Sequence, residues 1–249
     1  MRAAPLVLLG IVAYAAFAVA TMPARFAAAQ LEDRARNVVH VADASGTVWH
    51  GAARAQVDAG GVSVVLDNVA WRWLPAELLS GRMAFAIDAR AGEAQVNGTL
   101  ARSVSLWHAS GSADAPAAFA ATAYPLLGTF RPEGRITART DGIAWNDREA
   151  RGEAVAEWRA ASVAFSDVRP LGSYRVKLQA EGAATKLDAS TLEGPLRIAG
   201  QGTVTPPGAV TFNGEARAEG PNARALEPLL DMLGPKRADG AHTLQWRTR

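Results

Sequence analysis

Hydrophobic and polar residues alternate along most of the chain after residue 40. The segment Arg175–Glu181 is the clearest case, because Val176, Leu178 and Ala180 would lie on one face of a strand and polar residues on the other. Three further segments alternate in the same way: Val62–Leu66, Met83–Asp88 and Thr243–Arg247. A period of two is typical of strands with one packed and one hydrated face. The pattern predicts a mainly β protein, a curved antiparallel sheet or half-barrel.

Dipeptides typical of tight turns recur along the chain. Asn-Gly and Asp-Gly accept the positive φ angles of two-residue hairpin turns, so each predicts a turn between two strands. The four dipeptides are Asn97-Gly98, Asp141-Gly142, Asn213-Gly214 and Asp239-Gly240. They predict many short strands joined by hairpins.

Two short helices are expected among these strands. Pro75–Leu79 is followed by Gly81, and Pro228–Leu233 is followed by Gly234, which is the arrangement of a proline at the start and a glycine at the end. The second helix should bury one apolar stripe, because its leucines recur at helical spacing. These leucines are Leu226, Leu229, Leu230 and Leu233.

So few helices leave open how the apolar face of the sheet is covered. A sheet must pack that face against another layer, so one alternative is a sheet that curls on itself as a sandwich or half-barrel. In the other alternative, part of the face stays free for a ligand or partner. We favour the self-closed sheet.

The amino-terminal segment differs from the rest of the chain. Ala3–Ala24 carries no charge and lies between Arg2 and Arg25. A helix of this length can span a bilayer once. A cleaved signal peptide is the alternative, since Ala18-Val19-Ala20 has the pattern that signal peptidase cuts, but the apolar run exceeds the usual signal-peptide core. We therefore expect residues 1–30 to be a retained anchor with its flank and residues 31–249 to be a β domain.

The orientation of this anchor does not follow from its flanking charges. Arg2 precedes the segment, whereas Arg25, Arg34 and Arg36 follow it, which taken alone favours a cytoplasmic domain. Long domains translocate largely regardless of charge, and the amino-terminal tail is very short. We therefore expect a single-pass protein with its carboxy-terminal domain outside the cytoplasm.

The β domain contains a hint of internal duplication. Residues 46–111 and 134–220 each begin with a predicted strand of the pattern Gly-x-Val or Gly-x-Ile. Each then passes a tryptophan and reaches an Asn-Gly dipeptide near its end. Between them, Ser110–Tyr124 is rich in Ala, Ser, Gly and Pro, which indicates a linker. Two similar halves joined by this linker are the expected organisation.

Composition excludes several classes of function. The chain has no cysteine, which rules out disulfides, thiol catalysis and thiolate metal sites. Its formal net charge is only +2, and basic and acidic residues are interspersed. The sequence therefore lacks the basic stripe that is typical of nucleic-acid-binding proteins. The four histidines, at 40, 50, 108 and 242, have no neighbour at metal-ligand spacing, and no catalytic or dinucleotide-binding motif is present. We expect no metal, no cofactor and no enzymatic activity.

Seven tryptophans are the remaining candidates for function. A tryptophan in a strand most often fills a core or covers a sheet. Trp71 and Trp73 are the exception worth testing, because they share one face of a strand, with Arg72 on the other, just before a short helix. We predict that this pair contacts a partner or a membrane.

Several of these residues also carry a resemblance to a known family. They are Gly46, Thr47, Val48, Trp49, His50 and Gly51; Trp71-Arg72-Trp73-Leu74-Pro75; Leu78–Gly81; Pro170, Leu171, Gly172, Ser173, Tyr174 and Arg175; Leu192–Leu196 with Gly194; Gly200 and Gly202; and the Leu226–Leu233 helix. In this order they resemble the type II secretion system protein N family. The glycine-rich motifs, expected to be structural, are similar to those of AsmA-like periplasmic β proteins.

The resemblance implies a function. A member of this family would be a single-pass protein of the cell inner membrane with its carboxy-terminal domain in the periplasm. It would be a non-enzymatic accessory component of the machine that exports folded proteins across the outer membrane. Its partners would be other type II secretion components, the secretin or the inner-membrane platform. The AsmA-like kinship implies the alternative, an envelope protein that binds or transfers phospholipid in an apolar β groove.

Overall fold

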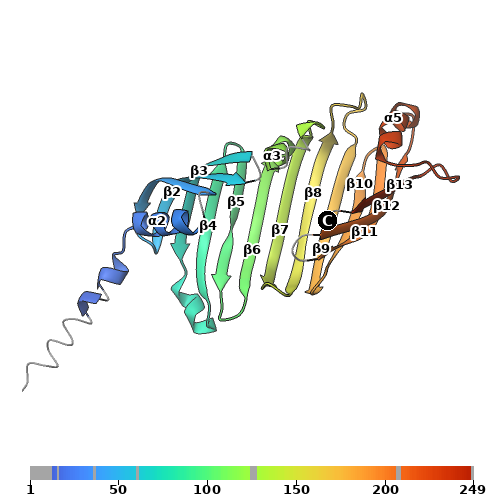
Figure 1. Cartoon of the computed structure of the whole chain (residues 1–249). Coiled ribbons are helices and arrows are strands. Elements are labelled where there is room, and N and C mark those ends of the chain that lie inside the picture. The colour runs from blue at the N-terminus through green and yellow to red at the C-terminus, as the bar shows by residue number, and fades with distance from the viewer. Residues whose placement is uncertain are drawn as a thin grey trace, which may run out of the picture.

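One antiparallel sheet makes up most of the protein (Figure 1). The computed structural model describes residues 13–15, 17–35, 38–59, 62–123, 128–205 and 209–247. These residues form a 13-stranded sheet in which each strand pairs with its neighbours in sequence. The strands are β1 (Val39–Gly46), β2 (His50–Ala59), β3 (Val62–Trp73), β4 (Met83–Ala91), β5 (Ala94–Arg102), β6 (Trp107–Pro116), β7 (Glu133–Trp145), β8 (Ala150–Ser162), β9 (Gly172–Gly182), β10 (Thr185–Glu193), β11 (Leu196–Thr205), β12 (Ala209–Ala218) and β13 (His242–Arg247). The prediction of a mainly β protein is confirmed.

The sheet is open. Its strand order runs from β1 to β13, and these two strands are not paired with each other in the part of the chain that the structure describes. The described strands therefore form neither a sandwich of two sheets nor a closed barrel, and the expectation that the sheet closes on itself is wrong. An open sheet is compatible with the predicted half-barrel, which stays a prediction. Closure requires the first and last strands to meet, which alternation within single strands cannot report.

The strand register gives the sheet one apolar and one polar face. Partners across an antiparallel pair lie on the same face, so Leu178 in β9 and Leu187 in β10 are side by side, as are Lys177 and Asp188 on the other face. Extending this pairing through every strand defines the apolar face. It includes Trp71, Phe85, Leu100, Ile143, Trp158, Val176, Leu178, Leu187, Ile198, Phe212 and Leu244.

Helices cover only parts of this sheet. The helix α2 (Ala24–Arg34) lies against β1 and β2, α3 (Ala117–Ala123) contacts β3, β6 and β7, and α5 (Ala223–Leu233) packs on β12 and β13. The largest buried cluster forms under α5, where Leu226, Leu229 and Leu230 meet Leu196 and Ala216. In the middle of the apolar face, side chains such as Leu178 and Leu187 are only half-buried.

The two ends of the strands differ, and we name them from Figure 1. At the lower end, odd-numbered strands finish and even-numbered strands begin; this end carries the 3₁₀ helix η1 (Pro75–Ser80) between β3 and β4. The upper end carries α3 and α5.

The short helix η1 bears out the first helix prediction. It has a proline at its first turn and ends at Gly81, whose φ of 68° is left-handed. The second helix begins earlier than predicted: α5 starts at Ala223, and Pro228 lies inside it rather than at its start. Of its leucine stripe, Leu226, Leu229 and Leu230 are buried, while Leu233 is exposed.

Three of the four hairpin predictions are wrong. Asn97-Gly98, Asp141-Gly142 and Asn213-Gly214 lie inside β5, β7 and β12, and only Asp239-Gly240 is in a turn. Gly98 faces Gly111 across the β5–β6 pair, and Gly214 faces Gly200 across the β11–β12 pair. These glycines serve close approach of neighbouring strands instead of reversal of the chain.

The predicted linker and anchor fall on different parts of the structure. Residues 110–123 of the expected linker form the second part of β6 and α3, so the division into two similar halves stays a prediction. Half of Ala3–Ala24, residues 3–12 and 16, lies outside the described residues. Within the described ranges, no helix combines the length and the apolar character needed to cross a membrane.

Candidate functional site

Tryptophans gather at the lower end of the sheet. All seven lie in the described part of the chain, and six of them are at this end: Trp49, Trp71, Trp73, Trp107, Trp145 and Trp246. Trp49 is in the β1–β2 loop, and the other five lie on the apolar face, at or within two residues of the strand end. Only Trp158 lies towards the upper end, where its indole N–H donates to the Glu133 carbonyl at 2.9 Å.

The β1–β2 loop joins this tryptophan group to the amino-terminal segment. The Val48 backbone N–H donates to the Met22 carbonyl at 2.9 Å, and the Trp49 indole N–H donates to the Val19 carbonyl at 2.8 Å. Pro23 and Thr47 form an isolated antiparallel bridge. The amino-terminal segment is therefore held against the lower end of the sheet.

Trp71 and Trp73 support the same loop. The Trp71 indole N–H lies 3.2 Å from the Thr47 carbonyl oxygen and 3.1 Å from that of Val48. The Trp73 ring packs on Trp49 with centroids 4.9 Å apart. Both side chains are half-buried. The structure thus brings together the two predicted site residues, and their contact with a partner or membrane stays a prediction.

Two glycines allow the loop to sit this closely. Gly46 has a φ of 82°, in the left-handed region that favours glycine. A Cβ atom on Gly51 would lie 2.7 Å from the Trp71 ring and 2.5 Å from the Ser45 carbonyl oxygen. The Thr47 hydroxyl accepts a hydrogen bond from the His50 backbone N–H at 3.1 Å. The motif Gly46–Gly51 is a tight turn shaped to receive Trp71.

The second family motif forms part of the core at the upper end. Leu171 is buried in the cluster under α5, and its backbone N–H donates to the Ala161 carbonyl at 2.7 Å. The Tyr174 hydroxyl donates to the Leu196 carbonyl at 3.2 Å, and burial raises the pKa of this phenol. A Cβ atom on Gly194 would lie 2.2 Å from Gly172 Cα. These contacts are those of a structural motif joining β9 to the β10–β11 turn.

Ser173, within the same motif, links two neighbouring strands through its hydroxyl. Its hydroxyl donates to the Glu193 carboxylate at 3.0 Å and accepts from the Ala160 backbone N–H at 3.3 Å. Pro170 precedes this group in the loop between β8 and β9. The motif therefore ties β8, β9 and β10 together.

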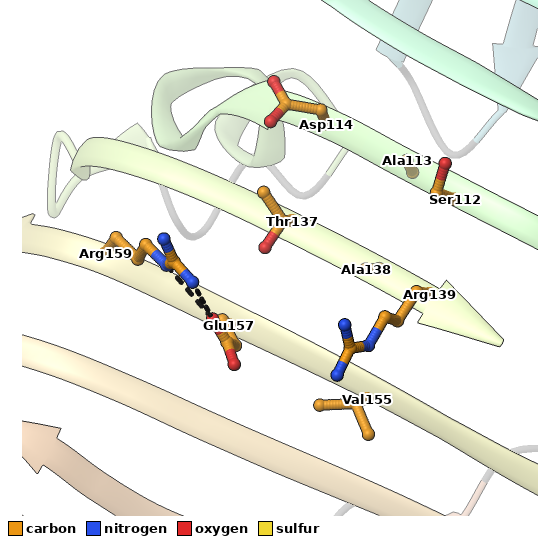
Figure 2. Close-up of a pocket in the computed structure, with 9 residues that line it drawn as sticks. All are labelled: Ser112, Ala113, Asp114, Thr137, Ala138, Arg139, Val155, Glu157 and Arg159. Atoms are coloured by element: carbon orange, nitrogen blue, oxygen red, sulfur yellow. Dashed lines mark hydrogen bonds and ion pairs between the residues drawn. The ribbon is translucent and has the colours of Figure 1, made fainter.

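The polar face has a shallow hollow of about 300 Å³ over β6, β7 and β8 (Figure 2). Glu157 is its central acid, and Figure 2 shows Arg159 reaching it from the same strand. Arg159 donates to one Glu157 oxygen and Arg175 to the other, at 2.7 and 2.8 Å for the shorter bonds. Hydrogen bonds from Arg159 and then Arg175 lower the pKa of the Glu157 carboxyl. Both oxygens of the Glu157 carboxylate are thus paired with arginines, one from its own strand and one from β9.

The described residues contain no candidate metal-binding cluster. They include no group of three or more His, Asp or Glu side chains that could hold an ion. The histidines are spread over β1, β2, β6 and β13. His242 is fully buried, with its Nδ1 atom 2.9 Å from the Gly234 carbonyl oxygen.

A comparison with known protein families finds a match for this chain. Residues 37–245 match the family model described as type II secretion system (T2SS), protein N. The chain belongs to this family. The matched range contains both motifs described above and all thirteen strands except the end of β13, so the predicted family is confirmed. No curated protein and no solved structure matches the chain.

Membership in the T2SS protein N family makes the chain a component of the type II secretion system. It implies interaction with other components of that system. The family is an accessory component of secretion and is not known as an enzyme.

The gathering of six tryptophans at one end of the sheet does not follow from any single segment of the sequence. Strand parity carries the signal: a tryptophan near the end of an odd-numbered strand and one near the start of an even-numbered strand lie at the same end of a meander. Applying this rule requires the correct number of strands. The three dipeptides wrongly predicted as turns divide β5, β7 and β12 and so give the wrong number. Leu79 and Val104, which project from loops at the lower end, were also not predicted as contact residues.

Proposed function

We propose that the protein is a non-enzymatic, inner-membrane-anchored component of the type II secretion system that supports export of folded proteins through contacts of its periplasmic sheet. Membership in the T2SS protein N family carries this proposal. The secretin and the inner-membrane platform are the proposed partners. The half-buried middle of the apolar face offers surface for such contacts.

The proposed anchoring rests on the amino-terminal segment. Its uncharged run, Ala3–Ala24, has the length of one bilayer crossing. The contacts of Val19 and Met22 with the β1–β2 loop keep the end of that run next to the sheet. A retained anchor would therefore hold the β domain at the periplasmic surface of the inner membrane.

Deletion of the gene tests this role. Exoproteins should accumulate in the periplasm and fall in the medium, because inner-membrane translocation continues while the outer-membrane step fails. The amounts in both fractions are measured by immunoblotting, and a periplasmic protein that is not exported serves as the translocation control. The intact gene supplied in trans should restore secretion. Unchanged extracellular levels in the deletion strain would refute the proposal.

A second candidate function is favoured by the open apolar face. In an AsmA-like role, this face would bind acyl chains of a phospholipid. Leu178 and Leu187 are cross-strand partners in its middle, and Lys177 and Asp188 are the matching partners on the polar face. These two pairs lie on the same two strands, so they provide matched variants.

Lipid retention by the full chain distinguishes this candidate. The double variant Leu178→Asn/Leu187→Asn should retain less phospholipid per purified chain than Lys177→Asn/Asp188→Asn, as measured by mass spectrometry. Lipid bound around the anchor is common to both variants, so the difference reports the sheet alone. Equal retention, with both variants showing an unchanged β circular dichroism spectrum, would argue against lipid binding on this face.

A further inference from the structure

The tryptophans at the lower end form a belt. Trp71, Trp73, Trp107 and Trp145 occupy the ends of strands β3, β6 and β7, with the Trp107 and Trp145 positions paired directly across β6 and β7. The Arg102 guanidinium lies 5.0 Å from the centre of the Trp107 ring. Tryptophan is enriched where hydrocarbon meets water, because its ring is apolar and its N–H is polar. A row of such rings at one end of a sheet is therefore suited to a membrane surface.

Apolar side chains project beyond this belt from two neighbouring loops. Leu79 in η1 is 94% exposed, and Val104 in the β5–β6 loop is 98% exposed. They are the most exposed large apolar side chains in the described part of the chain. At the upper end, by contrast, the exposed rings Phe130 and Phe165 pack against each other with centroids 5.8 Å apart. Leu79 and Val104 therefore lack the cover that the upper-end rings give each other.

The amino-terminal segment indicates what covers these tips. Its described end is hydrogen-bonded to the β1–β2 loop through Val19 and Met22, and that loop is at the lower end. Figure 1 shows residues 13–15 and 17–20 running down and to the left of the sheet, and η1 extending below it. A bilayer that holds the uncharged segment would face the loops at the lower end, nearest to β1–β6.

Charge limits the extent of this surface. The β7–β8 loop is also at the lower end but farther along the sheet, and it consists of Asn146, Asp147, Arg148 and Glu149. The Asn146 side chain accepts from the backbone N–H groups of Arg148 and Glu149 at 2.9 Å, which fixes this polar loop. Such a loop favours water over hydrocarbon.

We propose that the lower end of the sheet between β3 and β6 lies in the interface of the phospholipid bilayer, with the tips of Leu79 and Val104 in the outer part of the hydrocarbon and Trp107 at the headgroup level. This inference rests on the proposed anchoring. It adds a second contact with the membrane, which fixes the tilt of the sheet on the bilayer and leaves the charged β7–β8 loop and the upper end in water.

The absence of cysteine makes this surface directly testable. Single variants Leu79→Cys and Val104→Cys place an environment-sensitive nitrobenzoxadiazole dye at exposed loop positions, where no core packing is disturbed. Asp147→Cys is the control at the same end, and Glu93→Cys, in the β4–β5 turn, is the control at the upper end. The labelled full chain is reconstituted into phosphatidylethanolamine and phosphatidylglycerol vesicles, with and without lipids carrying a nitroxide on the acyl chain.

The proposal predicts a split between the two pairs of positions. Dyes at 79 and 104 should emit at shorter wavelength than those at 93 and 147 and should lose emission when nitroxide lipids are present. The result does not depend on which side of the vesicle the domain occupies. Vesicle flotation, measured on the same samples, reports anchoring separately.

Three outcomes would overturn the inference. Flotation with water-like dyes at all four positions would refute the bilayer contact and leave the anchoring intact. Failure to float would refute both the anchoring and this contact. A wavelength shift at 79 and 104 that needs a purified secretion component and is insensitive to nitroxide lipid would assign the surface to a protein partner.

Discussion

At the scale of single residues, glycine has two distinct uses in this sheet. Gly92 and Gly182 lie at hairpin ends with positive φ angles of 56° and 105°. Gly98 instead lies inside β5, and a Cβ atom there would meet the Ser110 carbonyl oxygen at 2.4 Å. Local sequence cannot separate these uses, because Asn-Gly is equally compatible with a turn and with a strand whose neighbour comes close. This is the physical reason why the hairpin predictions at Gly98 and Gly214 failed.

Replacing two strand glycines tests this distinction. Gly98→Ala should lower the free energy of unfolding by about 1 to 3 kcal/mol, because its methyl group would overlap the β6 backbone. Gly142→Ala is the matched control, since it belongs to another Asp/Asn-Gly dipeptide and an added Cβ meets no described atom within 4 Å. It should be neutral or stabilising by about 0.4 to 1 kcal/mol. Urea unfolding of the detergent-solubilised full chain, followed by tryptophan fluorescence, measures both. Equal midpoints for the two variants would contradict the close-approach argument.

At the scale of elements, α5 supplies Leu226, Leu229 and Leu230 to the main buried cluster. The sequence predicted three of its four stripe leucines correctly, because helical spacing is a local property, but Leu233 is exposed and the predicted start at Pro228 is wrong. A proline inside a helix removes one backbone hydrogen bond, so the start signal was read from a residue that the helix merely tolerates. The buried contacts of Leu226 and Leu230 with Leu196 and Ala216 supply the packing that makes this tolerable.

Truncation of the α5 stripe should show how strongly it contributes. Leu230→Ala is expected to cost about 2 to 5 kcal/mol of unfolding free energy, because Leu230 is only 2% exposed and its removal leaves a cavity. Met232→Ala, two residues along the same helix, should change it by less than about 0.5 kcal/mol, since Met232 is 65% exposed. Thermal unfolding monitored by circular dichroism gives the comparison. Similar losses in the two variants would mean that α5 does not pack as described.

At the scale of the whole molecule, the sequence predicted the type of secondary structure better than the arrangement of the strands in the sheet. Alternation identified β3, β4, β9 and β13 because a period of two is visible within one strand. The open shape was not predictable, since it depends on whether β1 and β13 meet. The tryptophan group at the lower end was likewise hidden: Trp71 and Trp73 are close in sequence, but Trp49 and Trp107 reach the same end only through the meander.

In a sheet where each strand pairs only with its sequence neighbours, a destabilising substitution should weaken mainly the strands around it. Its strand order is strictly sequential, so the described structure resembles a repeat array in which stability is a sum of neighbour interactions. Gly98→Ala should therefore speed amide hydrogen exchange in β5 and β6 and leave β10–β12 unchanged. Leu230→Ala should instead act on α5, on β11–β13 and on the β8–β9 loop, whose Val163, Val168 and Leu171 belong to the same buried cluster. In the double variant, the two effects should add, because the sites share no partners. Hydrogen exchange measured by mass spectrometry on the full chain resolves these segments. If Gly98→Ala accelerated exchange uniformly from β1 to β13, unfolding would be cooperative over the whole sheet, and stability would have to depend on interactions beyond the neighbouring strand pairs.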